Sequence, residues 1–197
     1  PRNRQTLCFS ATMAPNLKKL AYYYTYSPVV VNIEPKKVTL DTIRQEVVET
    51  TDRQKFDRLA QALQEDNPFL AIIFVRTKRR ANELFAKMKK QKFNVQVIHS
   101  DIAQNKRERI LKSFREADLQ YLIATDVASR GLDISGVTHI YNYDVPETPE
   151  TYIHRIGRTG RAGEDGYTCM FVAPKDNLEF NMIERKLRRN LPRRTFK

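Results

Sequence analysis

Apolar residues recur along most of the chain in short runs that are rich in β-branched and aromatic side chains. Several of these runs are apolar at consecutive positions, which is typical of strands buried on both faces of a parallel sheet. The pattern predicts strands at residues 45–49, 71–75, 95–98, 121–124, 139–143 and 167–172.

Apolar side chains between these runs follow the i, i+3, i+4, i+7 spacing of amphipathic helices. Two such stripes are Phe56, Leu59, Ala60, Leu63 and Ala81, Leu84, Phe85, Met88, and a third helix is predicted at residues 104–115. Strands and helices alternate from about residue 42 onward. We therefore expect an α/β domain with a parallel sheet and helices on both faces.

Residues 1–40 have a different pattern. One strand-like run, Leu7-Cys8-Phe9, and one helix-like stretch ending in Tyr22-Tyr23-Tyr24 precede a linker that contains prolines. Because a lone strand and helix bury too little surface to fold alone, we expect residues 1–40 to be the end of a preceding domain plus a linker. Residues 41–197 would form a separate domain. An orphan strand also raises the hypothesis of pairing with a neighbouring copy or another chain.

Charge is distributed unevenly along the chain. Lys and Arg number 35 against 23 Asp and Glu, a formal net charge of +12. Residues 76–92 carry a net charge of +7 and residues 175–197 carry +5, which together equal the whole excess. Arg79, Lys87 and Lys90 lie opposite the apolar stripe of the second predicted helix. Two local basic patches favour a nucleic-acid partner, and solvated helix faces are the alternative.

The two cysteines, Cys8 and Cys169, have no motif spacing that would indicate a disulfide framework or a metal site. This indicates a reducing, intracellular setting, either cytoplasmic or nuclear. The longest apolar run, residues 69–75, is far shorter than the roughly 20 residues of a membrane span, so no membrane partner is expected.

The densest chemistry lies at His154-Arg155-Ile156-Gly157-Arg158-Thr159-Gly160-Arg161. If a helix continued that far, Arg158 and Arg161 would lie close to one face. Two convergent guanidinium groups suit a phosphate, because the planar fork binds its oxygens bidentately. A surface helix followed by a turn is the alternative.

A second motif runs from Ala124 to Ile134, directly after an apolar strand. Ligands of open parallel sheets bind beyond the carboxyl ends of the strands, where Thr125 is expected. Gly131 would allow close approach of the backbone, and Asp133 could accept a hydrogen bond from a ribose hydroxyl. The alternative is a capped helix start, with Asp126 as the N-cap and Gly131 as the stop.

These motifs resemble those of DEAD-box RNA helicases, over essentially the whole chain and in the family's order. The matching elements are Ser10-Ala11-Thr12, Ile73-Phe74-Val75-Arg76-Thr77, Gln104 with Arg107, Ala124 to Ile134, and His154 to Arg161. The resemblance implies two RecA-like domains joined by a linker, with ATP and Mg²⁺ in the cleft and single-stranded RNA across both domains. The chain would supply the second domain and the end of the first.

The resemblance also implies residue roles. Gly131 and Asp133 would touch the nucleotide, and Arg158 and Arg161 would reach the γ-phosphate, with Arg161 the better candidate for an arginine finger. His154 would link this site to the amino-terminal RecA-like domain. The expected RNA contacts are Arg76, Thr77, Gln104, Arg107 and Thr125, and the expected interdomain contacts are Ser10, Thr12 and Arg130. Taken singly, Thr77 could be only a helix N-cap, and Gln104 or Arg107 only part of a solvated face.

Two features limit what the chain is expected to do. It contains no Gly-x-x-x-x-Gly-Lys-Ser/Thr loop and no Asp-Glu-Ala-Asp run, so we expect negligible ATP hydrolysis by the chain alone and no metal ligands in it. Ser100 stands where the family often has glycine, which puts a backbone contact to RNA there in doubt; His99 is expected to be structural. A DNA helicase or translocase, and a non-enzymatic RNA- or protein-binding module, are the competing functions. Protein cofactors are further candidate partners of the helicase.

Overall fold

A computed structural model describes residues 4–10, 15–31, 42–129, 136–160 and 165–196. The chain divides into two compact units, Pro1–Lys37 and Val38–Lys197, which are described separately.

The first unit contains the helix α1 (Pro15–Tyr24), which buries none of its residues. Large apolar side chains such as Phe9 and Tyr23 are more than four-fifths exposed. Leu7-Cys8-Phe9 form no strand within the described residues of this unit, and their pairing with another chain stays a prediction. A strand requires a hydrogen-bonded neighbour, and the described residues of this unit offer none.

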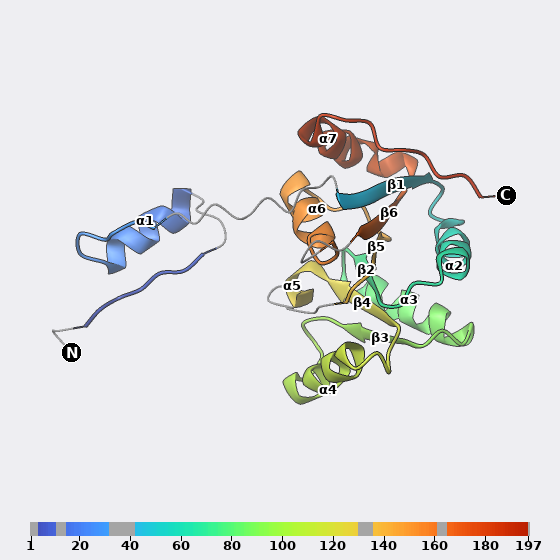
Figure 1. Cartoon of the computed structure of the whole chain (residues 1–197), viewed down its shortest axis with the longest axis horizontal. Coiled ribbons are helices and arrows are strands. Elements are labelled where there is room, and N and C mark those ends of the chain that lie inside the picture. Colours follow the sequence, from blue (N-terminus) through green and yellow to red (C-terminus); the bar gives the residue numbers. More distant parts are fainter. Residues whose placement is uncertain (1–3, 11–14, 32–41, 130–135, 161–164, 197) are drawn as a thin grey trace. The chain divides into compact units, whose positions relative to one another are not determined.

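The second unit is built on a sheet in which every pair of neighbouring strands is parallel, in the order β1-β6-β5-β2-β4-β3 (Figure 1). Its strands are β1 (Ile43–Glu49), β2 (Ala71–Val75), β3 (Val95–Ile98), β4 (Tyr121–Thr125), β5 (His139–Asn142) and β6 (Gly166–Val172). All six match predicted runs; β2 and β3 have the predicted bounds, and the other four strands differ by one or two residues at one end. The predicted α/β class with a parallel sheet is confirmed.

Helices cover both faces of this sheet (Figure 1). They are α2 (Lys55–Asp66), α3 (Lys78–Lys90), α4 (Gln104–Arg115), α5 (Asp126–Ser129), α6 (Pro149–Ile156) and α7 (Asn177–Leu187). Leu63 of α2 and Leu84 of α3 pack in one apolar cluster on one face. On the opposite face α4 and α5 pack through residues such as Phe114, and α6 and α7 through residues such as Ile183. The core therefore consists of two apolar layers separated by the sheet.

Helix α7 is an element that the apolar pattern did not predict. It buries only Phe180 and Ile183, so its helical period is weak in the sequence. Both side chains lie in the same apolar cluster as Tyr152 and Ile156 of α6. The position of this helix is therefore decided by packing against another helix.

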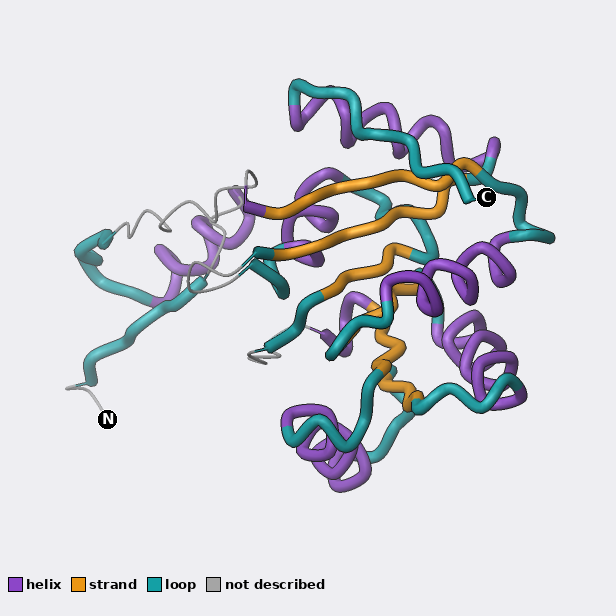
Figure 2. The backbone as a smooth tube through the Cα atoms, turned by 45° about the vertical axis from the view of Figure 1, so that its right-hand side comes forward, coloured by secondary structure: helices purple, strands orange, loops and turns teal. Residues whose placement is uncertain are grey.

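The segment after α7 follows the outer edge of β1. The amide of Val47 donates to the carbonyl of Pro192 at 2.9 Å, and the amide of Arg194 donates to the carbonyl of Val47 at 2.7 Å. Arg193 pairs with Glu49 and Glu184, and Arg194 pairs with Glu65 and Asp66. Figure 2 shows this segment beside the outermost strand. Two arginines of the second basic stretch are thus structural, because their charges are neutralised within the domain.

The two cysteines differ in exposure, which predicts different reactivity. Cys8 is exposed, whereas Cys169 in β6 is buried, and burial raises the pKa of its thiol to about 12. We expect a thiol reagent at pH 8 to modify Cys8 rapidly in the folded protein and Cys169 only after unfolding, because the thiolate is the reactive form. Mass spectrometry of the labelled peptides with and without denaturant measures this. Rapid native labelling at Cys169 would contradict the buried position of β6.

The start of β6 is packed against the turn that follows α6, and this generates a second prediction. A Cβ atom added at Gly166 would lie 2.7 Å from the backbone nitrogen of Gly160 and 2.8 Å from Cγ2 of Thr159. We expect Gly166→Ala to lower the free energy of unfolding by about 1–3 kcal/mol, as overpacking does. Denaturant titration measures it, with Asp165→Ala at the exposed neighbouring position as the control. Equal stabilities of the two variants would refute the close contact.

Candidate functional site

The carboxyl ends of four neighbouring strands meet at one edge of the sheet. Val75 is in register with Thr125, Phe74 with Asn142, and Ile98 with Ala124. The residues that follow these strands therefore lie at the same edge, although they are far apart in the sequence. This edge includes the predicted RNA contacts at the end of β4, at the start of α4 and directly after β2: Thr125, Gln104, Arg76 and Thr77.

Arg76 follows β2 and is partly exposed at this edge. Its Nη2 donates to the carbonyl of Val145 at 3.0 Å and lies 3.9 Å from a carboxylate oxygen of Asp176. Its Nε is buried, has no hydrogen-bond partner among the described residues, and lies 4.0 Å from Oε1 of Glu147. The guanidinium is thus held by groups of the domain, and 34% of the side chain is exposed.

Thr77 and Gln104 begin the two helices that flank this edge. Thr77 is exposed, and its hydroxyl accepts from the amide of Arg80, so it is the N-cap of α3. Its hydroxyl hydrogen can still be donated to an outside acceptor. Gln104 donates to Glu108 at 2.8 Å within α4.

Arg107 and Thr125 are more enclosed. Arg107 of α4 donates from Nη2 to the carbonyl of Ala128 at 2.7 Å, and so ties α4 to α5. Thr125, the last residue of β4, is 8% exposed. Arg107 was expected to contact RNA, and the structure adds a structural contact that the sequence did not indicate.

Arg155 of α6 is the most completely bonded charged group at this edge. It is 2% exposed, and its Nε and Nη2 donate to the two carboxylate oxygens of Asp126 at 2.6 and 2.8 Å. Its Nη1 donates to Oδ1 of Asn142 at 3.0 Å and to the carbonyl of Asp144 at 2.8 Å. The guanidinium carbon lies 5.0 Å from the ring centroid of Phe74. Arg155 therefore joins α6 to the ends of three strands.

Asp144, just beyond β5, anchors the other side of the edge. Its carboxylate accepts from the amide of Arg76 at 3.0 Å and from Arg80 at 2.8 and 2.7 Å. Burial opposes the charge on Arg80, but the carboxylate of Asp144 outweighs it, so the pKa of Arg80 is raised. The buried Lys55 lies 4.0 Å from Asp144 and donates to Asp176 at 3.2 Å. The charges beneath Arg76 are thereby balanced.

The helix that leads into the arginine motif ends earlier than expected. α6 stops at Ile156 with Gly157 as its C-cap, so the expectation that Arg158 continues a helical face is wrong. His154 is exposed on α6, and Arg158 is partly exposed in the turn that follows. Thr159 closes this turn, since its buried hydroxyl donates to the carbonyl of Val137 at 2.6 Å.

Several predicted site residues lie outside the described residues. These are Thr12, Arg130, Gly131, Asp133 and Arg161. Ser10 is described and exposed in the first unit. The alternative start of a capped helix at Asp126 is also corrected, because Asp126 is the first residue of α5 and its carboxylate binds Arg155.

His99 is structural, as the sequence suggested. It is 4% exposed, its Nε2 is 3.1 Å from Oδ1 of Asn82, and its Nδ1 accepts from the amide of Asp101. Asp101 in turn pairs with Lys78, and this hydrogen bond lowers the pKa of Asp101. Together these contacts fasten the end of β3 to the start of α3.

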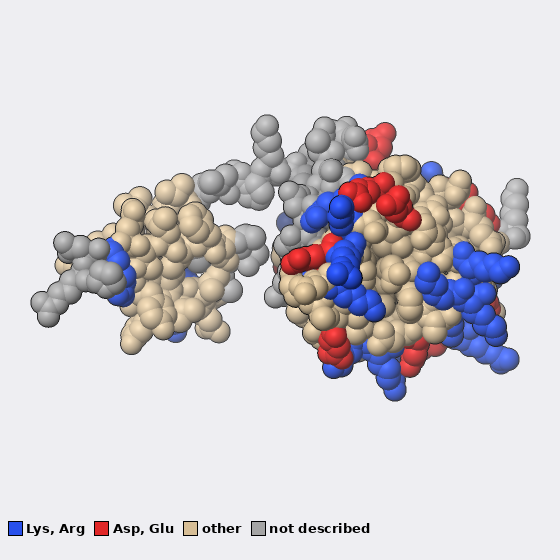
Figure 3. All heavy atoms as spheres, turned by 90° about the horizontal axis from the view of Figure 1, so that it is seen from below, with Lys and Arg blue, Asp and Glu red and all other residues tan. Residues whose placement is uncertain are grey.

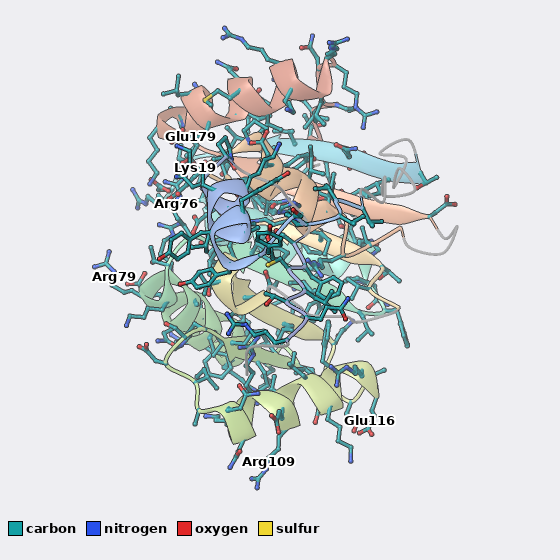
Figure 4. The ribbon with its side chains drawn as sticks, turned by 90° about the vertical axis from the view of Figure 1, so that its left-hand side faces the viewer. Lys19, Arg76, Arg79, Arg109, Glu116 and Glu179 are labelled. Atoms are coloured by element: carbon teal, nitrogen blue, oxygen red, sulfur yellow. The ribbon has the colours of Figure 1, made fainter. Side chains whose placement is uncertain are left out.

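Basic side chains gather in groups on the surface of the second unit (Figure 3). Figure 3 shows groups of Lys and Arg on the second unit, interrupted by Asp and Glu. Figure 4 shows Arg79 and Arg109 pointing outward from α3 and α4. Lys87 and Lys90 are exposed on α3, as predicted.

The described ranges contain neither a metal-ligand cluster nor a membrane-spanning helix. Within them, no group of three or more His, Cys, Asp or Glu side chains is arranged to hold a metal ion. No helix there combines the length and apolar character needed to cross a bilayer.

Sequence reasoning missed the structural roles of Arg155, Asp126 and Asp144. Arg155 lies inside the arginine motif, for which the sequence offered a phosphate site or a surface helix followed by a turn. The structure corrects that interpretation, since Arg155 is buried and bonded within the domain. The available signal was the apolar face of the helix: Arg155 directly precedes the buried Ile156 and follows the buried Tyr152 by three positions.

Known proteins match the chain in sequence. A family model described as the helicase conserved C-terminal domain matches residues 54–163. The DEAD-box ATP-dependent RNA helicase CshA of Bacillus cereus is 44% identical over 193 residues, which is 98% of this chain and 37% of that protein. The CshA of Bacillus subtilis is 45% identical, over 98% of this chain and 39% of that protein. The chain thus spans less than two fifths of the length of these relatives.

Solved structures match the chain in fold. Saccharomyces cerevisiae Dbp5 bound to RNA and ADP BeF3 has a TM-score of 0.81 at 33% identity, covering 94% of this chain and 50% of that one. A DEAD box protein from the hyperthermophile Methanococcus jannaschii has a TM-score of 0.74 at 32% identity, covering 95% of this chain and 50% of that one. The six-stranded parallel sheet and the arginine-bearing helix α6 are thus shared with known helicases. The chain belongs to the helicase conserved C-terminal domain family, as the RecA-like C-terminal domain of a DEAD-box RNA helicase.

Proposed function

We propose that the chain is the carboxy-terminal part of an ATP-dependent RNA helicase, which binds RNA and completes an ATPase site with its arginines. The observation that carries this proposal is the convergence of Arg76, Thr77, Arg107 and Thr125 at the carboxyl edge of the sheet, next to the helix that leads into Arg158. The activity of the full-length protein would be local unwinding of RNA duplexes or remodelling of RNA–protein complexes.

The RNA-facing groups suit a nucleic-acid backbone. Guanidinium and hydroxyl groups at strand ends and helix starts bind phosphates and sugars without reading sequence. The partly exposed guanidinium of Arg76 and the exposed hydroxyl of Thr77 provide donors of this kind. The similar Dbp5 structure is described as bound to RNA, and the relatives are RNA helicases, which favours RNA over the DNA alternative.

The nucleotide-facing groups are assigned by the family motif. Arg158 and Arg161 would contact the γ-phosphate, with Arg161 as the arginine finger, and Gly131 and Asp133 would contact the nucleoside. ATP and Mg²⁺ would be held mainly by an amino-terminal RecA-like domain of the same protein, because this sequence contains no Gly-x-x-x-x-Gly-Lys-Ser/Thr loop and no Asp-Glu-Ala-Asp run. Ser10, Thr12, Arg130 and His154 would make the interdomain contacts. Protein cofactors are further candidate partners.

The mechanism that follows is assembly of the site by domain closure. RNA and ATP together would draw the two domains into contact, and Arg158 and Arg161 would then meet the γ-phosphate. Their fixed charge stabilises the negative charge that develops on the transferring phosphoryl group. RNA gripped along the carboxyl edge would be held in a shape that a duplex cannot keep, and hydrolysis would reopen the cleft.

The arginine finger generates a prediction for the full-length protein. We expect Arg161→Ala to lower RNA-stimulated ATP turnover by about 10³-fold or more, because such a finger supplies roughly 10³–10⁵ in rate. RNA affinity without nucleotide should remain unchanged. A coupled phosphate-release assay measures turnover, with Arg189→Ala on the exposed segment after α7 as the matched control.

Two further outcomes distinguish the competing functions. The chain alone serves as the baseline, since we expect it to hydrolyse ATP negligibly until an amino-terminal half is added. If Arg161→Ala left full-length turnover unchanged, the catalytic assignment would fall and a non-enzymatic binding module would become the leading function.

The RNA assignment generates a separate prediction. We expect Arg76→Gln to weaken binding of single-stranded RNA and to reduce the slope of log affinity against log salt by about 0.7, the value for one phosphate contact. Arg109→Gln is the control, because Arg109 is exposed on the same surface but points outward from α4 (Figure 4). Fluorescence anisotropy at several salt concentrations measures both. Equal slopes for the two variants would mean that Arg76 makes no specific phosphate contact.

A further inference from the structure

Helix α3 connects the proposed RNA edge to the opposite side of the domain. It begins beside Thr77, its N-cap at the carboxyl edge, and it ends at Lys90, before β3 starts at the other edge of the sheet. Its 13 residues span about 20 Å, because an α-helix rises about 1.5 Å per residue. The outer face of this helix is therefore continuous with the edge at which the RNA contacts are proposed.

The outer face of α3 is formed by residues that project in similar directions. At about 100° per residue, four positions of the helix lie within about 60° of one another. They are Arg79, Glu83, Ala86 and Lys90. All four are exposed, and Arg79 points outward in Figure 4. Because Ala86 has no atoms beyond Cβ, a ligand can approach the helix closely between the charged side chains.

Positive charge is concentrated at the end of α3 that is far from the carboxyl edge. Residues 84–93 include no acidic residue and four lysines, which are Lys87, Lys89, Lys90 and Lys92. All four are exposed, and none of them pairs with a carboxylate among the described residues. This end of the helix therefore has a positive charge that the described part of the domain does not neutralise.

The carboxyl ends of other helices differ in this respect. Lysines in the last turn of any helix are stabilised by the partial negative charge of its carboxyl end, and this accounts for part of the charge on α3. In the last turn of α4, however, Lys112 pairs with Glu116, and in the last turn of α7 Lys186 pairs with Glu150. The unpaired lysines of α3 thus suit an anion from outside the domain.

Two phenyl rings restrain the lysines at this basic end. Nζ of Lys87 lies 5.5 Å from the ring centroid of Phe56 in α2, and Nζ of Lys89 lies 5.9 Å from the ring centroid of Phe85. Both rings are partly buried against the core beneath them. Cation–π attraction holds the two ammonium groups near the rings while both lysines stay exposed, so less side-chain entropy is lost when they bind an anion.

We propose that the outer face of α3, from Arg79 to Lys92, is an accessory surface that binds the phosphate backbone of single-stranded RNA beyond the carboxyl edge. Contacts of this kind add affinity without reading sequence. Glu83 lies on the same face, with Oε1 3.6 Å from Nε of Arg79, and its negative charge opposes RNA binding. The inference rests on the proposed function, because the RNA reaches α3 from the carboxyl edge.

The test compares two oligouridylates in the full-length protein, of about 8 and about 16 nucleotides, which lie within the range of single-strand site sizes. Fluorescence anisotropy gives the ratio of the affinity for the longer RNA to that for the shorter RNA. For Lys87→Gln/Lys90→Gln we expect this ratio to fall by about threefold to tenfold, because each exposed ion pair contributes modestly. The slope of log affinity against log salt for the longer RNA should decrease by about 1.4, the value for two phosphate contacts. Affinity for the shorter RNA should stay unchanged.

A second variant changes the same ratio in the opposite direction. Glu83→Gln removes the carboxylate from the outer face and frees Arg79 to bind a phosphate. We expect it to raise the affinity ratio by about twofold, in keeping with the strength of one exposed ion pair. A variant that only damages the fold would not bind the longer RNA more tightly, so this increase reports the charge of the face itself.

The matched control is Lys112→Gln/Lys186→Gln, which removes two positive charges from α4 and α7 and should keep the wild-type ratio. If Lys87→Gln/Lys90→Gln also keeps that ratio, the lysines of α3 bind no RNA and serve another partner, such as an acidic protein, and the inference is overturned. If the wild-type protein binds neither RNA, the proposed function itself fails, and this inference with it.

Discussion

A guanidinium group buried at the end of a parallel sheet is the interaction on which the arrangement of the site depends. An isolated buried charge is strongly unfavourable, and removing one partner of a buried pair leaves the other uncompensated. Arg155 avoids this cost because Asp126, Asn142 and the carbonyl of Asp144 accept its hydrogen bonds. The same contacts fix the strand ends and α6 relative to one another.

The surrounding core makes this polar centre possible. Apolar side chains on both faces of the sheet bring β2, β4 and β5 into register, so that groups from distant parts of the chain meet at one edge. Charged residues in this region divide into two groups. Arg155, Lys55 and Asp144 are buried and bonded within the domain, whereas Thr77, Arg79 and His154 face outward. The first group holds the geometry of the edge, and the second group remains exposed around it.

The sequence predicted the sheet well because buried parallel strands are nearly continuous apolar runs. Residues 71–75 and 121–125 are buried at every position, and this kind of pattern is distinct from that of a half-exposed helix. Helices α2, α3 and α4 were also predicted, because each buries a stripe with helical period. Thr77 could be interpreted in two ways from sequence, and it is in fact the N-cap of α3 while it is also exposed at the carboxyl edge.

The residue order by itself determined the α/β class, most strand and helix positions, and the family of the motifs, since all of these depend on local periodicity and short spacing. The tertiary structure decided which arginine is buried, where α6 ends, that α7 packs on α6, and that Arg193 and Arg194 neutralise acidic residues beside β1. These features depend on partners far away in the sequence: Arg155 lies 29 residues from Asp126, and Arg194 lies 128 residues from Asp66. A pattern of local spacing contains no information about such pairs, because only the packing of the sheet brings them together.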